Sequence, residues 1–112
     1  ERGKKEIPGV TLSENGEILD YDVTLQTESV FRNIRYILED AGTSWDNILD
    51  VTVFLTNMKK DFPVFNKLYA AAFEGVNACR TTLEIGALPT PIAVELKVLA
   101  WIDDDPRAGN SM

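Results

Sequence analysis

Apolar positions recur at a helical spacing from about residue 24 to residue 41. Repeats of three and four residues place such positions on one face of a helix. The members of this stripe are Val30, Ile34, Ile37, Leu38 and Ala41. Asp22 or Thr24 can cap the start of the segment, and Gly42 closes its end. The pattern predicts an amphipathic helix that buries the stripe.

A second helical pattern runs over residues 61–73 and has a wider apolar face. Its apolar members are Phe62, Phe65, Leu68, Tyr69, Ala72 and Phe73. Asp61 is the predicted N-cap, and Pro63 lies in the first turn, where proline is tolerated. Gly75 ends the segment. We therefore predict a second helix here.

Three segments alternate with the period of a β-strand, over residues 48–56, 80–88 and 92–102. The first is rich in β-branched residues, and the third carries a row of six apolar residues at every second position. Pro89-Thr90-Pro91 separates the second segment from the third and predicts a hairpin-like reversal between them.

The two ends of the chain are polar. Residues 1–23 are rich in charge and turn residues, including Asn15-Gly16, and predict a polar N-terminal loop region. Residues 104–112 predict a flexible tail. We expect a single domain over residues 1–112, because no internal linker or repeat interrupts the patterned segments.

The order helix, strand, helix, strand, strand predicts an α+β domain of two layers, with both helices on one face of a small mixed sheet. The other face of that sheet is a mixture of polar and apolar side chains. We assign to it Thr52, Phe54, Thr82, Leu99 and Trp101. A sheet face of this kind often meets a partner subunit, so we expect an oligomer. A monomeric mass in solution would count against that hypothesis.

Composition narrows the function classes. The chain has 112 residues and a net charge of −7, which disfavours non-specific binding to nucleic acid or an anionic membrane. No apolar run is long enough to span a bilayer. The single cysteine fits a reducing compartment, so we expect a cytoplasmic protein. The absence of histidine excludes Ser–His–Asp and Cys–His catalysis and disfavours zinc and haem, so no cofactor is expected.

Arg80 opens the second predicted strand and is the first candidate for chemistry. Its guanidinium is a planar fork that matches a carboxylate with two parallel hydrogen bonds. The alternative is a solvated arginine at a strand end, or one that pairs with Glu84. Cys79 precedes Arg80, and neighbours in a strand point to opposite faces, so we interpret this thiol as a bystander.

Glu95 is the second candidate, because glutamate is uncommon in the middle of a strand. In one interpretation Glu95 and Lys97 lie on a face of the sheet that is exposed to solvent. In the other, a second subunit covers that face. Glu95 is then a partly desolvated carboxylate, which suits a group that moves protons.

Several blocks together resemble the YjgF/RidA family. From about Gln26 onward the similarity covers roughly three-quarters of the chain in co-ordinated blocks. The matching segments are Asn33-Ile34-Arg35 through Ala41-Gly42, Asp50-Val51-Thr52-Val53-Phe54-Leu55, Asn66-Lys67-Leu68-Tyr69-Ala70-Ala71-Ala72-Phe73, Arg80-Thr81-Thr82-Leu83-Glu84-Ile85, Leu88-Pro89 and Val94-Glu95-Leu96-Lys97. The spacing from the arginine through Leu-Pro to the glutamate follows the family pattern without a gap.

The resemblance implies a chorismate-mutase-like α+β fold and a homotrimer with active sites between subunits. It also implies hydrolysis of reactive enamines and imines to a carbonyl compound and ammonia, without a cofactor. By position, Arg80 would bind the carboxylate of a small-molecule substrate, and Glu95 would position or activate the water. Thr82 stands where the family often has a cysteine, and its backbone N–H would help to bind the substrate.

The chain departs from the family pattern in three places. Thr82 keeps the backbone donor of the usual cysteine but lacks the thiol, and Ala78 stands where the family usually has proline. Nothing in the chain matches the N-terminal strand pair that lines the family's cleft, so we expect one wall of the pocket to be missing. The polar N-terminal segment, Gln26-Thr27 and the Arg80-Thr81-Thr82 block resemble relatives of 2-aminomuconate deaminase.

Three other functions stay open at this point. The same cleft could bind a small carboxylate or keto acid without turnover. Ribonuclease activity is also associated with the family, although the net charge of −7 and the absence of histidine argue against it. A purely structural trimer is the third alternative.

Overall fold

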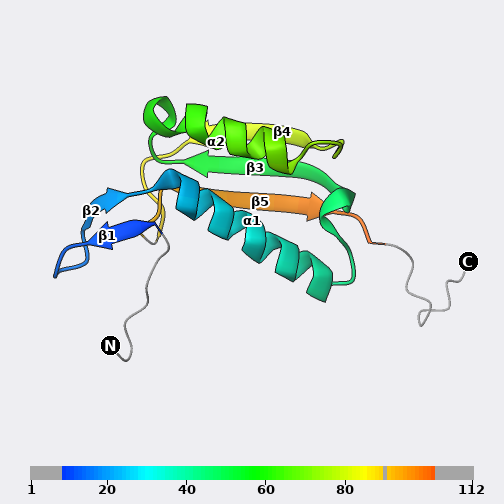
Figure 1. Ribbon diagram of the computed structural model, residues 1–112, viewed down its shortest axis with the longest axis horizontal. Coiled ribbons are helices and arrows are strands. Elements are labelled where there is room, and N and C mark those ends of the chain that lie inside the picture. The colour runs from blue at the N-terminus through cyan, green and yellow to red at the C-terminus, as the bar shows by residue number, and fades with distance from the viewer. Residues whose placement is uncertain (1–8, 90, 103–112) are drawn as a thin grey trace, which may run out of the picture.

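The computed structural model describes residues 9–89 and 91–102. Two helices pack on one face of a three-stranded sheet, and a short hairpin precedes them (Figure 1). The helices are α1 (Val23–Asp40) and α2 (Met58–Ala72); the strands are β1 (Val10–Leu12), β2 (Ile18–Tyr21), β3 (Ile48–Leu55), β4 (Cys79–Glu84) and β5 (Val94–Ala100), and a 3-10 turn, η1, covers Trp45–Asn47. The predicted α+β class with two helices on a mixed sheet is confirmed.

The first turn of α1 is capped as predicted, by Asp22. Its carboxylate accepts hydrogen bonds from the backbone N–H groups of Thr24 at 2.9 Å and Leu25 at 3.2 Å. The second helix begins earlier than predicted, because Asn57 and not Asp61 caps it. The Asn57 side chain accepts the N–H of Lys60 at 3.1 Å. Asp61 thus lies inside the helix, where it is buried.

The buried face of α1 differs from the predicted stripe. Phe31, Ile34 and Leu38 are buried, whereas Ile37 is 65% exposed and Ala41, at the end of the helix, is exposed too. Phe31 lies seven residues before Leu38, two helical turns away on the same face. Its ring contacts those of Trp45, Phe65 and Phe73 edge-on, with centroid distances of 5.6, 6.2 and 6.0 Å. This aromatic cluster fills the layer between the helices and the sheet, and the placement of Ile37 and Ala41 on the buried stripe was wrong.

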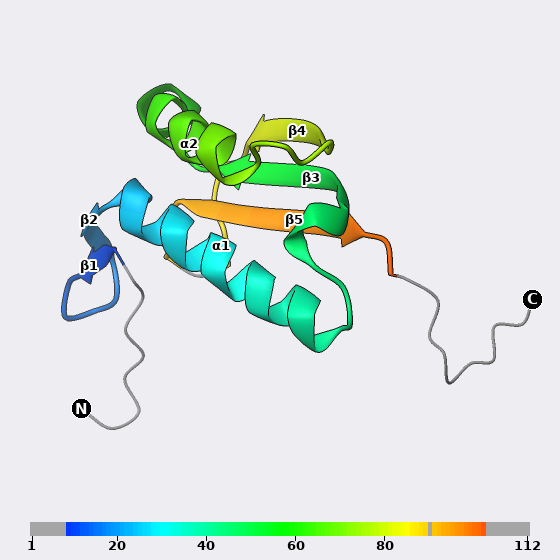
Figure 2. The same cartoon turned by 45° about the vertical axis from the view of Figure 1, so that its right-hand side comes forward.

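The central strand is β3, which is parallel to β4 and antiparallel to β5. The chain leaves β3, passes through α2 and returns in the same direction as β4. Such a parallel pair needs a crossover connection. Because β3 separates β4 from β5, the hairpin-like reversal predicted between those two strands is wrong, and the segment around Pro89 instead carries the chain past β3 (Figure 2).

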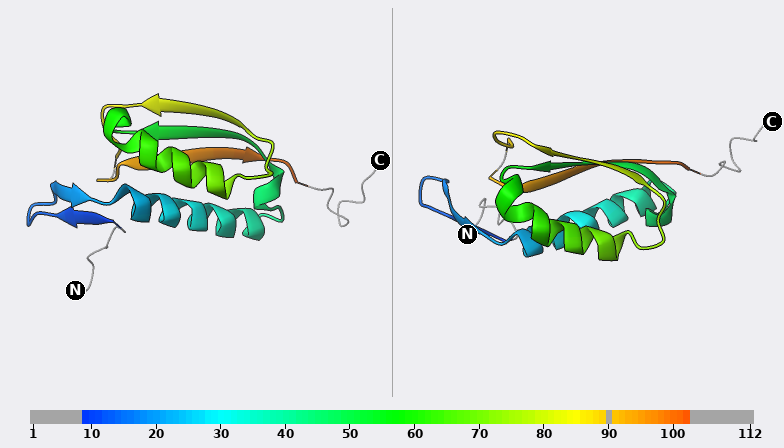
Figure 3. Two further views of the ribbon diagram at one scale, coloured as in Figure 1. Left: turned by 45° about the horizontal axis from the view of Figure 1, so that its top comes forward. Right: turned by 90° about the horizontal axis from the view of Figure 1, so that it is seen from above.

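Side chains of the sheet divide between a covered and an open face. Val51, Val53 and Leu55 of β3 are fully buried beneath the helices. No described helix lies against the other face (Figure 3). Thr82 pairs with Val53 in the parallel register, so it belongs to the helix-covered face. Its assignment to the opposite face is therefore a correction.

The segment expected to be a polar loop contains strands β1 and β2, which form a separate two-stranded antiparallel sheet. Asn15-Gly16 forms the predicted turn. Gly16 has φ +89°, and the Ser13 N–H donates to the Glu17 carbonyl at 2.8 Å. The expectation of a loop throughout residues 1–23 is wrong for these strands, which are too short to show an alternating pattern. Residues 1–8 and the predicted tail at 104–112 lie outside the described residues.

The hairpin does not pair with the three-stranded sheet. Within the described part of the chain, no helix is long and apolar enough to cross a membrane.

The aromatic core gives a direct test of the fold. Phe65 is fully buried, and its replacement in Phe65→Ala should lower the free energy of unfolding by about 3–5 kcal/mol. Ile37→Ala, which truncates a side chain that is 65% exposed, should change that free energy by about 0.5 kcal/mol or less. Urea unfolding of both variants measures the difference. Equal losses would show that Ile37 belongs to the core after all.

Candidate functional site

Arg80 lies at the start of β4, on the face covered by the helices, because it pairs in register with the buried Val51. Helix α2 holds its guanidinium. Nη1 of Arg80 donates to Oδ1 of Asn66 at 2.7 Å. The guanidinium carbon also lies 4.6 Å from the centroid of the Tyr69 ring and 5.5 Å from that of Phe62. The Arg80 guanidinium thus packs against two aromatic rings and is hydrogen-bonded to one amide.

The Arg80 side chain remains available to a ligand. The residue is exposed, and a guanidinium has five N–H donors, of which the Asn66 bond uses one. The alternative in which Glu84 pairs with Arg80 is not what the structure shows. Oε1 of Glu84 accepts the backbone N–H of Met58 at 2.7 Å, at the first residue of α2. Sequence reasoning found Arg80 but missed Asn66 and Tyr69 as its supports.

The pKa of Tyr69 reflects its position beneath the Arg80 guanidinium. Burial raises the pKa of the Tyr69 hydroxyl above its ordinary value, and the positive charge of Arg80 acts in the opposite direction. Tyr69 is therefore a neutral ring beneath the cation at physiological pH. A neutral ring suits a supporting role, since its face attracts the cation without neutralising the charge that a carboxylate would bind.

Thr82 lies two residues along β4 from Arg80 and shares its face. The structure therefore brings these two predicted substrate-binding residues together. The Thr82 hydroxyl is buried and has no hydrogen-bond partner. A buried hydroxyl of this kind is not open to a substrate, so the predicted contribution of Thr82 rests on its backbone N–H alone.

Glu95 lies on β5, at the opposite edge of the sheet from Arg80. It pairs with Phe54, whose neighbours Val53 and Leu55 face the helices, so Glu95 projects from the open face. It is exposed there. Arg80 and Glu95 thus differ in both strand and face. A single chain does not bring the two together.

The open face around Glu95 is partly apolar. Leu83, Leu99 and Trp101 are 44%, 56% and 47% exposed, and Phe54, which lies between Leu83 and Glu95, is half-buried. Lys97 follows Glu95 on the same face, opposite Thr52. Apolar side chains spread over all three strands are typical of a surface that packs against another protein surface.

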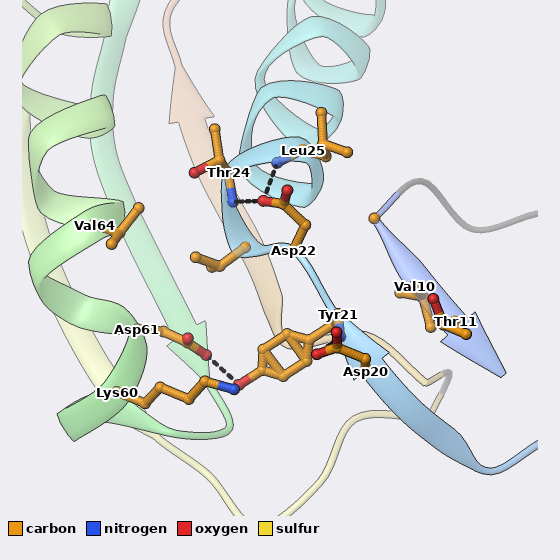
Figure 4. A pocket seen from close by; sticks show the side chains of 12 residues that line it. Val10, Thr11, Asp20, Tyr21, Asp22, Thr24, Leu25, Lys60, Asp61 and Val64 are labelled. Carbon is orange, nitrogen blue, oxygen red and sulfur yellow. Dashed lines mark hydrogen bonds between the residues drawn. The ribbon is translucent and has the colours of Figure 1, made fainter.

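A separate hollow of about 640 Å³ lies between the hairpin and the beginnings of α1 and α2 (Figure 4). The Tyr21 hydroxyl donates to Oδ2 of Asp61 at 2.7 Å, and Asp61 is only 2% exposed. Nζ of Lys60 lies 4.4 Å from the centroid of the Tyr21 ring. Neither Arg80 nor Glu95 lines this hollow. The sequence offered no signal for it, because Asp61 had the features of a helix cap.

Residues that could hold a metal ion do not gather in the part of the chain that the structure describes. No group of three or more His, Cys, Asp or Glu side chains forms there.

Comparison with known proteins places the chain among its relatives. Residues 7–102 match the family described as Endoribonuclease L-PSP. The chain belongs to this family. The family is the one also called YjgF/RidA or RutC, so the resemblance drawn from the sequence is confirmed at the level of the family. The matched residues include Arg80, Thr82 and Glu95.

Two relatives show the extent of the similarity. A RutC family protein of Pyrococcus abyssi is 35% identical over 88 residues, which are 79% of this chain and 68% of the relative. The chloroplastic Reactive Intermediate Deaminase A of Arabidopsis thaliana is 29% identical over 91 residues, which are 81% of this chain and 48% of the relative.

Among solved structures, E. coli TdcF with bound serine superposes with a TM-score of 0.64 at 29% identity. The superposition covers 70% of this chain and 64% of TdcF. This chain thus shares the fold of the family, and the TdcF structure contains bound serine, an amino acid with a carboxylate.

Tyr21 provides a test that depends on pH. Burial, the hydrogen bond to Asp61 and nearby carboxylates raise the pKa of Tyr21 from 10.0 to about 12. Because the folded-state pKa is the higher one, this stabilisation is complete below pH 10 and is lost as the pH rises toward 12. The advantage of the wild type over Tyr21→Phe in free energy of unfolding should therefore shrink over that range.

Tyr36→Phe is the matched control, since Tyr36 is 59% exposed on α1. Denaturant unfolding between pH 9 and 11.5 measures both differences. An advantage over Tyr21→Phe that stays constant with pH would contradict the buried contact with Asp61.

Proposed function

We propose that the protein hydrolyses small enamines or imines that carry a carboxylate, releasing ammonia and a carbonyl compound. The observation that carries the proposal is Arg80, a guanidinium fixed by α2 with donors left for a ligand. The family relationship to Reactive Intermediate Deaminase A supports the chemistry, and the serine bound to TdcF supports a carboxylate ligand.

Binding begins at Arg80. A carboxylate can take two parallel hydrogen bonds from the guanidinium, which fixes both the position and the orientation of a small substrate. Asn66 and Tyr69 restrict the rotation of the arginine before the substrate arrives. Less ordering is then needed on binding, and the imine carbon meets its water in a set geometry.

Glu95 serves as the proton carrier. Protonation of the enamine carbon first gives an iminium ion, whose carbon is electrophilic. Glu95 accepts a proton from a water molecule while the water oxygen bonds to that carbon, which gives a neutral carbinolamine. Glu95 then returns this proton to the nitrogen, and the C–N bond breaks as the hydroxyl group gives its own proton to Glu95, which leaves a carbonyl group and free ammonia. The step consumes one water and needs no oxidant, reductant or cofactor.

The catalytic unit in this proposal is a homotrimer. Arg80 and Glu95 lie at opposite edges and on opposite faces of one sheet, so they can act on one substrate only if they come from two copies of the chain. The exposed apolar residues of the open face favour such packing. A cyclic trimer would form the same composite site at each of its three interfaces.

A dicarboxylate such as 2-aminomuconate is the narrower candidate for the substrate. Lys97 shares the open face with Glu95, and its ammonium group could attract a second carboxylate. Enamines derived from amino acids carry one carboxylate and would not need Lys97. Comparing the two substrates in Lys97→Ala separates the cases, since only turnover of the dicarboxylate should fall.

Non-catalytic binding of a small carboxylate is the second candidate function, because TdcF is seen with serine bound. Calorimetry with a keto acid and an ammonia assay distinguish the two. Binding that requires Arg80, without ammonia release from any enamine tested, would favour the binding protein.

Two substitutions test the deaminase proposal. Glu95→Gln should lower kcat by about 10²–10⁴, because it removes the proton carrier but keeps the shape of the side chain. Arg80→Ala should lower kcat/KM by about tenfold to a hundredfold, since it removes hydrogen bonds to a charged group. Ammonia release under steady-state conditions measures both.

The exposed α1 residues Arg32 and Glu39 supply the controls Arg32→Ala and Glu39→Gln, which should be fully active. Full activity of either site variant would refute the assignment.

A second test asks whether the two residues come from different copies. The variants Arg80→Ala and Glu95→Gln carry different tags, and assemblies that contain both are isolated by two successive affinity steps. In every mixed trimer one of the three interfaces combines the intact Arg80 with the intact Glu95, so about a third of wild-type activity should return. If both residues acted from one chain, the mixed assemblies would be as inactive as each variant alone.

A further inference from the structure

Gln26 is a buried amide in the first turns of α1, and it connects two segments far from each other in sequence. It is only 3% exposed. Its Oε1 accepts the backbone N–H of Ala93 at 2.8 Å, and its Nε2 donates to the carbonyl of Gly9 at 3.5 Å. An amide buried among apolar residues is costly unless it is hydrogen-bonded, so both contacts bear on where these segments lie.

Ala93 is the residue that leads into β5. It is 1% exposed, and its two backbone polar groups are both engaged. Gln26 takes its N–H, and the N–H of Thr56 donates to its carbonyl at 3.1 Å. Val94 follows and is fully buried, and Glu95 comes next on the open face. Ala93 is therefore held from α1 through its N–H and from the end of β3 through its carbonyl, two residues before Glu95.

We propose that Gln26 is a positioning residue for Glu95: by holding the N–H of Ala93 it fixes where β5 begins, and so how the Glu95 carboxylate projects from the open face. The inference rests on the proposed function, in which Glu95 carries the proton. If the amide is removed, the N–H of Ala93 is left buried without a partner, which typically costs more than the bond itself contributes. The start of β5 then shifts to reach water, and Glu95 shifts with it.

A shift at the start of β5 should affect Glu95 but not Arg80. Arg80 is on β4, beyond β3, and its supports come from α2. Loss of the Gln26 contact should thus disturb proton transfer and leave carboxylate binding unchanged. A general loss of stability would instead affect kcat and KM without regard to Glu95.

The test uses Gln26→Met, which keeps the length of the side chain and removes its hydrogen bonds. Thr27→Val is the matched control: Thr27 is the next residue, fully buried, and its hydroxyl has no partner to lose. The first measurement is the ¹³C resonance of the Glu95 carboxyl group together with amide exchange at Ala93. Gln26→Met should move the resonance and speed the exchange, and Thr27→Val should do neither.

The second measurement is a double-mutant cycle on ammonia release. Gln26→Met should lower kcat about tenfold with KM within about twofold, and it should have no further effect when Glu95 is already glutamine. An equal effect in both backgrounds would overturn the inference, as would an unchanged Glu95 resonance. If the wild type releases no ammonia, the proposed function fails, while a shifted resonance still supports the link from Gln26 to Glu95.

Discussion

The pairing of β3 with a strand on each side determines where every candidate group of this protein can act. Val51 sets the face of Arg80 through the parallel register with β4, and Phe54 sets the face of Glu95 through the antiparallel register with β5. Successive side chains in a strand alternate between faces, so neither residue can change sides without a shift of the whole strand. In the proposed mechanism each chain consequently presents two half-sites, Arg80 and Glu95, which face in different directions.

Helix α2 joins the stability of the domain to the first half-site. Phe65 is buried against Phe31 and Tyr69, while Asn66 and Tyr69 on the same helix hold the Arg80 guanidinium. The packing of the core therefore restricts the arginine that would bind a carboxylate. Gln26 has a comparable place at the second half-site, because it is part of α1 and contacts the residue that leads into β5. Both half-sites thus depend on how the helices sit on the sheet.

The sequence predicted the helices and the three main strands, since each has a clear period and strong end signals. It did not predict the strand order, because Pro89 is compatible with either a hairpin or a longer connection. Helix periodicity allows either Phe31 or Ile37 beside Ile34 and Leu38, and the aromatic contacts of Phe31 decide between them. The arginine and glutamate were recognised by their spacing within a family pattern. The hydrogen bonds between Asn66 and Arg80 and between Gln26 and Ala93 join distant segments, and no local pattern records them.

The central claim is that Arg80 of one copy and Glu95 of another serve the same ligand. A crystal structure of the assembled protein with a bound 2-keto acid tests it most directly, because such an acid resembles the carbonyl product and keeps the carboxylate. The account predicts the carboxylate on Arg80 of one copy, with the keto carbon facing Glu95 of a neighbouring copy. A ligand bound to Arg80 with no Glu95 near its keto carbon, or one seated in the hollow beside Tyr21, would contradict it.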